Sequence, residues 1–134
     1  MMIQTVAEAI AVLDQPAGSS TEREDAIHFL HNHPSPEGAE RLVAALSDDD
    51  TGVRWAAAQG LIDYGERALP PLLRALAQNA GNSNLRIGAY QVLHDNPNAS
   101  IREQMVELIK ALRGPGADVA SMQAASKLYL SMAK

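Results

Sequence analysis

The chain contains no cysteine and few aromatic residues, and both shortages narrow what it can be. Without cysteine there is no disulfide framework, no thiolate metal site and no cysteine nucleophile. Aromatic residues make up 4% of the 134 residues, whereas apolar residues make up 46%. The interior must therefore consist of Leu, Ile, Val, Met and Ala side chains, which are typical of closely packed helices. The composition predicts an all-α protein of one domain in a reducing, cytoplasmic setting.

Two further shortages argue against whole classes of partner. No stretch approaches about 18 consecutive apolar residues, and the first four residues lack the basic start of a secretory signal. The formal net charge is −5, which opposes nucleic-acid binding because that binding needs clustered Lys and Arg to replace counterions on phosphates. We therefore expect no membrane insertion and no nucleic-acid partner.

Apolar side chains recur at spacings of three and four residues along most of the chain, and no stretch alternates with period two. Thr21 with Glu24 predicts a capping box, and Ser35 followed by Pro36 predicts a second helix start. Gly65 is a predicted helix stop. The recurring apolar side chains, with these starts and stops, predict helices over 2–14, 21–32, 36–46, 52–64, 69–78, 85–94, 101–112 and 117–133.

An internal repeat organises these helices. The motif that begins at Val53, V-R-x-A-A-x-x-x-L, recurs from Leu85 as L-R-x-G-A-x-x-x-L, 32 residues further on. Weaker copies lie around Ala26 and Ala125. One helix pair cannot cover its own apolar faces, so the pairs must stack. We predict an α-solenoid of about three stacked helical hairpins (units 21–47, 50–78 and 82–113) with an extra helix at each end, 2–14 and 117–133.

The run from Asp50 to Ala58, D-T-G-V-R-W-A-A-A, with the Leu-rich stretch up to Gln78, resembles the short HEAT-like repeat of the phycobilin-lyase class. Residues 85–112 resemble it less closely, with Asn82-Ser83-Asn84 in place of the usual acidic turn. The resemblance implies a curved stack, first helices on the convex side, second helices on the concave side, and a protein that mostly binds other proteins. Some members, with a second subunit, attach or detach bilin chromophores. The signatures of tetratricopeptide and ankyrin repeats are missing.

These features favour an adaptor or scaffold that binds a partner protein on its concave helical surface, without catalysis, cofactor or metal. No nucleophile elbow, phosphate loop or paired-carboxylate motif is present. The alternative is a subunit or relative of a bilin lyase, or another cofactor-loading accessory factor, and a third possibility is a piece of a longer solenoid or regulatory enzyme. His28, His31 and His33 share a helix end, but three histidines without a rigid cage are more typical of a solvated terminus than of a metal site.

Partner binding is expected on the exposed faces of the second helices. Aligning those helices brings Arg74 and Lys110 to equivalent positions on adjacent units. Two neighbouring cations on an acidic chain favour an acidic partner segment. Trp55, on a first helix, is a further candidate, because tryptophan is frequent among the residues that dominate binding energy. The alternative is that Trp55 is a bulky structural side chain on the convex side. The predicted partner-contact residues are Arg74, Lys110, Arg67, Glu40, Glu103 and Trp55.

Other residues are predicted to fasten the repeats to one another. A carboxylate at a helix start favours the positive end of the helix dipole, and an arginine one turn later can bridge to the turn of a neighbouring unit. Asp50, Arg54 and Arg86 are predicted to act in this way.

The last helix is a candidate homodimer interface through Met122, Tyr129 and Met132.

Overall fold

The computed structural model describes residues 2–15 and 18–132, and every regular element in those ranges is helical. The all-α solenoid of helical hairpins is confirmed. None of these helices combines the length and the apolar character that a bilayer crossing requires. The elements are α1 Val6–Leu13, α2 Ser20–Asn32, α3 Pro36–Ala45, α4 Thr51–Tyr64, the 3₁₀ turn η1 Gly65–Ala68, α5 Leu69–Asn79, α6 Ser83–His94, α7 Ala99–Gln104, α8 Val106–Arg113 and α9 Ala117–Met132.

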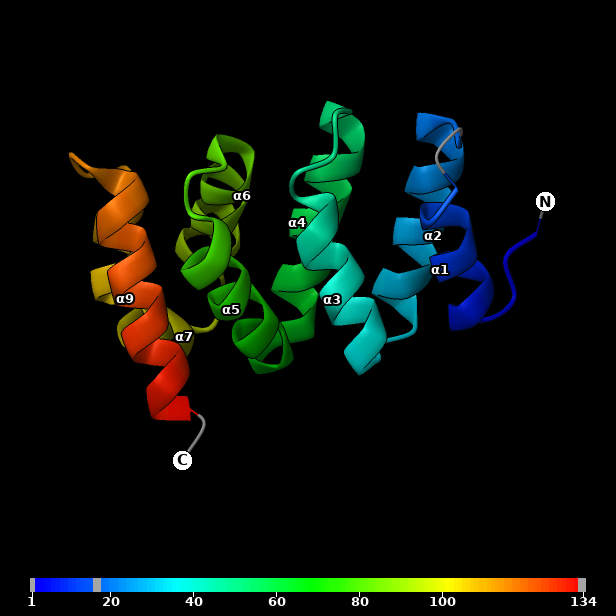
Figure 1. The fold of residues 1–134 in the computed structure, drawn as a ribbon. Helices are drawn as coiled ribbons and strands as arrows, with labels where there is room; N and C mark the ends of the chain where they lie inside the picture. The colour runs from blue at the N-terminus through cyan, green and yellow to red at the C-terminus, as the bar shows by residue number, and fades with distance from the viewer. Residues whose placement is uncertain (1, 16–17, 133–134) are drawn as a thin grey trace.

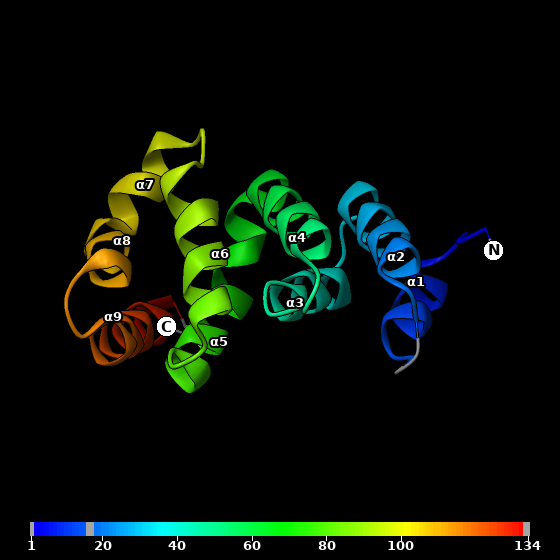
Figure 2. The ribbon, with the colours of Figure 1, turned by 90° about the horizontal axis from the view of Figure 1, so that it is seen from above.

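The helices stand in two rows (Figures 1 and 2). We call α2, α4, α6 and α8 the first row, and α1, α3, α5 and α9 the second row. Within the rows α2 packs on α4, α4 on α6, α6 on α8 and α5 on α9, while α1 on α2, α3 on α4 and α8 on α9 join one row to the other. The apolar faces of both rows therefore enclose one continuous core.

Side-chain caps mark the starts of α2, α3 and α4. Asp50 accepts a hydrogen bond from the Val53 N–H at 3.1 Å, and Ser35 accepts one from the Gly38 N–H at 2.9 Å, with Pro36 in the first turn as predicted. The capping box predicted at Thr21 is wrong. Ser19 caps α2 by accepting from the Glu22 N–H at 3.1 Å, because the same S/T-x-x-E pattern also occurs two residues earlier, where Ser19 has extended backbone.

Two glycines act through the space or the backbone angle that they allow. Gly65 ends α4 with φ of 63°, in the region where a side chain would be strained, as the sequence predicts. Gly88 lies where α6 crosses Leu46, and a Cβ atom at this position would be 2.8 Å from Leu46 Cδ2. The close approach of α6 to this part of the core therefore depends on the missing side chain.

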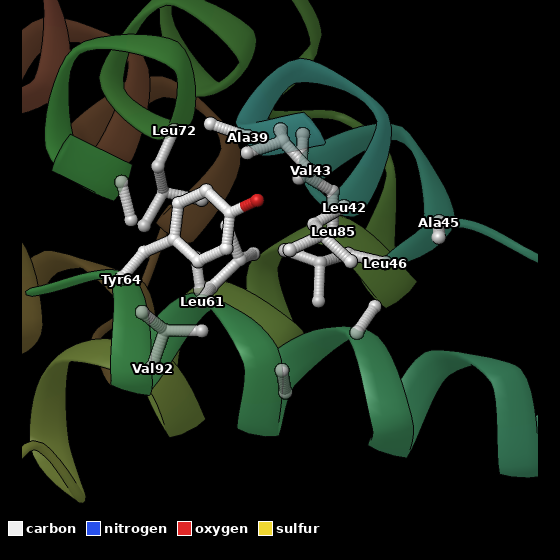
Figure 3. Close-up of a cluster of buried hydrophobic side chains, with 14 of the residues drawn as sticks. Ala39, Leu42, Val43, Ala45, Leu46, Leu61, Tyr64, Leu72, Leu85 and Val92 are labelled. Carbon is white, nitrogen blue, oxygen red and sulfur yellow. The ribbon is translucent and has the colours of Figure 1, made fainter. Parts of the chain in front are cut away.

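The core follows the repeat that the sequence shows. Leu30, Leu61 and Leu93 occupy equivalent positions in α2, α4 and α6, and all three are fully buried. Ala57 and Ala89, also equivalent, have no exposed surface, so the small side chains lie where the first-row helices touch. Figure 3 shows the middle of this core, where the ring of Tyr64 lies next to Leu61 and Leu72.

The helix predicted over 101–112 is divided. Met105, with φ −100° and ψ 9°, ends α7 and precedes α8. The expectation that this segment is the second helix of a third unit is wrong, because α8 lies in the first row beside α6, and α9 is the second-row neighbour of α5 (Figure 2). A short turn joins α6 to α7, so α8 runs antiparallel to α6, whereas α2, α4 and α6 run in one direction (Figure 1).

The start of α7 explains this departure. Asn98 accepts from the Ser100 N–H at 2.9 Å, and the Arg102 guanidinium donates to the Asn96 carbonyl at 2.5 Å. Arg86, at the start of α6, makes the same arginine-to-carbonyl contact with Ala80. A first-row type of helix start thus recurs 16 residues after the previous one, from Arg86 to Arg102. The chain returns to the first row without building a second-row helix in between.

Candidate partner-binding face

The residues predicted to fasten the repeats lie at the starts of first-row helices. Arg54 donates to the Asp48 carbonyl at 2.6 Å, and Arg86 donates to the Ala80 carbonyl at 2.5 Å. Each arginine thus bonds the turn that joins its helix to the preceding one, while Asp50 caps α4. These bonds leave other N–H groups of both guanidiniums available for a ligand.

Arg23 makes a further contact of this kind, which the sequence reasoning missed. Its guanidinium donates to both carboxylate oxygens of Asp48, at 2.9 and 3.0 Å, and joins α2 to the turn before α4. The sequence does contain a signal for this contact, because Arg23 occupies the position of Arg54 in the weak upstream copy of the repeat. Burial alone would raise the pKa of the Asp48 carboxyl, but hydrogen bonds from Arg23 and the Asp50 N–H, with the charges of Arg23 and Arg54, bring that pKa below its ordinary value.

An acid titration tests this contact. Because the pKa of Asp48 is lower in the folded chain than in the unfolded chain, its carboxylate stabilises the fold above about pH 4, and that contribution is lost as the pH falls. Arg23→Gln should therefore flatten the fall in the free energy of unfolding between about pH 5 and about pH 3. Urea denaturation at several pH values measures it. Arg41→Gln, whose partner Asp14 is more exposed, is the control with a smaller expected effect, and an unchanged acid profile for Arg23→Gln would contradict the assignment.

The predicted pair of cations on the second helices is not formed. Arg74 lies on α5 in the second row and is ion-paired with Glu40 of α3. Lys110 lies on α8 in the first row, 4.0 Å from Glu107. The neighbour of α5 in its row is α9, so the expectation that Arg74 and Lys110 lie side by side is wrong. Of the other predicted contact residues, Arg67 lies in η1 with its guanidinium 5.7 Å from the Tyr64 ring centre, and Glu103 is exposed on α7.

The first row presents a different surface, which begins at Trp55. This side chain is 60% exposed on α4, and Ile87 at the equivalent position of α6 is 67% exposed. A groove of about 180 Å³ lies between α4 and α6 and is lined by both side chains. A second groove of about 370 Å³ lies between α6 and the end of α8, lined by Ile87, Tyr90 and Leu112. Ile87 is therefore a ridge between two grooves, a feature that the sequence reasoning did not find.

Both grooves are bordered by arginine. Arg54 lines the first groove, while Arg86 and Arg113 line the second, and no acidic residue lines either one. Arg113 donates to the Tyr90 hydroxyl at 2.9 Å, with its guanidinium 5.1 Å from the centre of that ring. Within residues 2–15 and 18–132, no carboxylate forms a salt bridge with any of the three arginines. We call this surface the arginine face, formed by Arg54, Trp55, Arg86, Ile87, Tyr90 and Arg113.

The histidines at the end of α2 have other contacts. His31 Nε2 lies 2.5 Å from a carboxylate oxygen of Asp63 and so links α2 to α4. His33 stacks on Phe29, with Nδ1 3.0 Å from the Phe29 carbonyl oxygen. In the part of the chain that the structure describes, no three His, Asp or Glu side chains are grouped so that they could hold a metal ion.

The terminal helix leaves several apolar side chains exposed. Val119, Met122 and Leu130 of α9 are exposed, while Tyr129 is partly buried against the core. Homodimer formation through this helix stays a prediction.

Stacked antiparallel helices in two rows, with one shared core, define an α-solenoid. The family model described as HEAT repeats matches residues 6–94, and the chain therefore belongs to the HEAT-repeat family. The chain is similar to a HEAT repeat-containing taxis protein of Halobacterium salinarum, with 38% identity over 78 residues. That match covers 57% of this chain and 19% of the relative's length. No solved structure matches the chain.

Proposed function

We propose that this chain is a protein-binding scaffold and that its partner docks on the arginine face. The observation that carries the proposal is the exposure of Trp55 and Ile87, two large apolar side chains that line one groove. Exposed apolar clusters beside a groove, bordered by polar groups, are typical of protein interaction sites. HEAT repeats generally mediate contacts between proteins and are typically not enzymes, which agrees with this function.

The second-row surface supports partner binding less well. Two of its cations are already neutralised, since Arg41 pairs with Asp14 and Arg74 with Glu40. A partner that used them would have to break these ion pairs first. The three arginines of the arginine face carry no such cost, because they form no salt bridge among the described residues.

The similarity to the Halobacterium salinarum protein supports the repeat architecture in this proposal and no more. Only 19% of that protein's length is matched, so its role in taxis is not transferred to this chain. Bilin handling is retained as the second candidate because residues 50–78 resemble the phycobilin-lyase type. Mixing the chain with free bilin tests it, and an unchanged absorbance spectrum would discard it. The cytoplasmic location expected from the composition stays a prediction.

Site-specific cross-linking tests the docking face. Gln91 of α6 lines the groove beside Ile87, and Gln78 of α5 is exposed in the second row. A photoreactive amino acid at position 91 is expected to capture the partner in the native host, while the same group at position 78 is not. Capture from position 78 alone would place the partner on the second row and contradict the proposal. Cross-links between two copies of the chain would indicate self-association instead.

The captured partner, once purified, allows a quantitative check. The double variant Trp55→Ala with Ile87→Ala is expected to weaken its binding by at least roughly 30-fold, the factor that about 2 kcal/mol represents, because a single side chain at the centre of an interface can contribute that much and such contributions are not additive. The helical circular dichroism spectrum should be unchanged, since both side chains are largely exposed. Unchanged affinity would contradict docking on this face.

A further inference from the structure

Resting on the proposed function, we infer that the partner segment is an acidic amphipathic helix that crosses the first row, with apolar side chains seven residues apart seated on either side of Ile87. Two features of the arginine face lead to this class of partner. One is the sign of its charge, and the other is the distance between its two grooves.

The charge of the face is opposite to that of the whole chain. The net charge is −5, yet the residues that line the two grooves include Arg54, Arg86 and Arg113 and no Asp or Glu. A basic partner would be attracted by most of the molecular surface and repelled at the grooves. An acidic partner would be repelled elsewhere and attracted at the grooves, which directs it to this face and makes its association dependent on salt.

The chemistry of the arginines favours carboxylates. Each guanidinium has five N–H donors, and the contacts in the structure use two in Arg54, one in Arg86 and one in Arg113. The bonds to the Asp48 and Ala80 carbonyls fix Arg54 and Arg86 at the starts of α4 and α6. A carboxylate that arrives there meets donors that are already oriented, so that less side-chain entropy is lost on binding.

The spacing of the grooves favours a helix over an extended segment. Packed helices lie about 8–10 Å apart, so the two grooves that flank α6 are separated by a similar distance. Seven residues of an α-helix rise about 10.5 Å and bring the side chain back to the same face after about two turns. An extended chain covers this distance in about three residues, and an odd offset turns the side chain to the opposite face. Same-face positions of a strand lie about 7 or about 14 Å apart, so a helix matches the two grooves better than a strand does.

Trp55 provides a direct measurement, because it is the only tryptophan in the chain and it lines one groove. The probe is a synthetic helix of about four turns with Leu at two positions seven residues apart and Glu at the flanking positions. We expect it to shift the Trp55 emission to the blue as it covers the indole ring. A second peptide with Lys in place of every Glu, and a third with Ser in place of both Leu, should each bind at least about tenfold more weakly.

Salt and matched variants complete the experiment. Raising NaCl from about 0.1 M to about 1 M shortens the screening length from about 10 Å to about 3 Å, and should weaken the Glu peptide several-fold. The double variant Arg86→Gln with Arg113→Gln should bind the Glu peptide at least about tenfold more weakly, and Arg86→Lys with Arg113→Lys should recover part of that loss. The control double variant Arg41→Gln with Arg74→Gln, whose arginines are paired on the second row, should bind as the wild type does.

Two results would overturn the inference. One is equal or tighter binding of the Lys peptide, and the other is the absence of an emission shift with the Glu peptide up to millimolar concentration. If either occurs while the partner still cross-links at position 91, the docking face is right and the partner class is wrong. If the partner cross-links at position 78 alone, the proposed function fails with it.

Discussion

Replacing Tyr64 with Ala is expected to lower the free energy of unfolding by about 3–5 kcal/mol, the largest loss that we expect from a single substitution in this chain. The ring is 4% exposed and packs inside the core between the rows (Figure 3). Its hydroxyl donates to the Leu30 carbonyl at 2.7 Å and accepts from the Ser35 N–H at 3.3 Å. One side chain of α4 therefore fills the core and also bonds the end of α2 and the turn before α3.

Tyr64→Phe separates these two contributions. It keeps the ring and leaves the Leu30 carbonyl without the donor in the core, so the expected loss is about 1–3 kcal/mol. Chemical denaturation of both variants measures the two values. A loss as large in Tyr64→Phe as in Tyr64→Ala would show that the ring contributes nothing by packing, and a wild-type value for Tyr64→Ala would contradict its burial.

Wild type and Tyr64→Phe are also expected to differ in stability at alkaline pH. Burial raises the pKa of Tyr64, although the Ser35 N–H and the charge of Arg67 oppose the shift. A phenol whose pKa is raised by folding contributes stability that is complete below about pH 10 and is lost as the pH rises through the folded-state pKa. Wild type should therefore lose more stability than Tyr64→Phe above about pH 10.

The second large effect is expected from Gly88→Leu. A Cβ atom at this position would lie 3.2 Å from both Cβ and Cγ of Leu46, and 2.8 Å from its Cδ2. Leu46 is fully buried, so it cannot turn towards solvent, and α6 must move away from the core. Overpacking of this kind costs about 1–3 kcal/mol, and occasionally more. Thermal and urea denaturation measure the loss.

Alanine variants provide the controls for this prediction. In Gly88→Ala the gain of about 1 kcal/mol in helix propensity offsets part of the clash, so its loss should be clearly smaller than that of Gly88→Leu. Gly81→Ala adds a Cβ atom where nothing lies within 4 Å, so its stability should not fall measurably. Wild-type melting of Gly88→Leu would contradict the close packing of α6 on Leu46.

Most of the helices could be predicted from the sequence because their signals are local. Apolar residues spaced by three and four, the Ser35-Pro36 start and Gly65 act within one or two turns of chain. The cap at Ser19 was missed for a local reason as well, since two overlapping patterns satisfied the same rule and only the backbone conformation selects between them.

The candidate site was harder to predict because it depends on which helices become neighbours. Trp55 was recognised as a candidate from its residue type, but Ile87 and Arg113 were not, since they come from α6 and α8 and meet only in the folded chain. The predicted pair of cations, Arg74 and Lys110, is wrong for the same reason. That prediction requires each first helix to be followed by its own second helix, and the chain has no second-row helix directly after α6.

The sequence by itself determined the helical class, the repeat and its buried leucines and alanines, because each depends on spacing along a single helix. Only the tertiary structure decided which row each helix after α6 joins. The apolar face of 101–112 suits either row equally well, and its place is decided by the short turn after α6 and by α9, which packs against both α5 and α8. Long-range packing of this kind leaves no periodic pattern in the sequence. The sequence therefore does not show which side chains share a surface, and only the packing of the helices decides it.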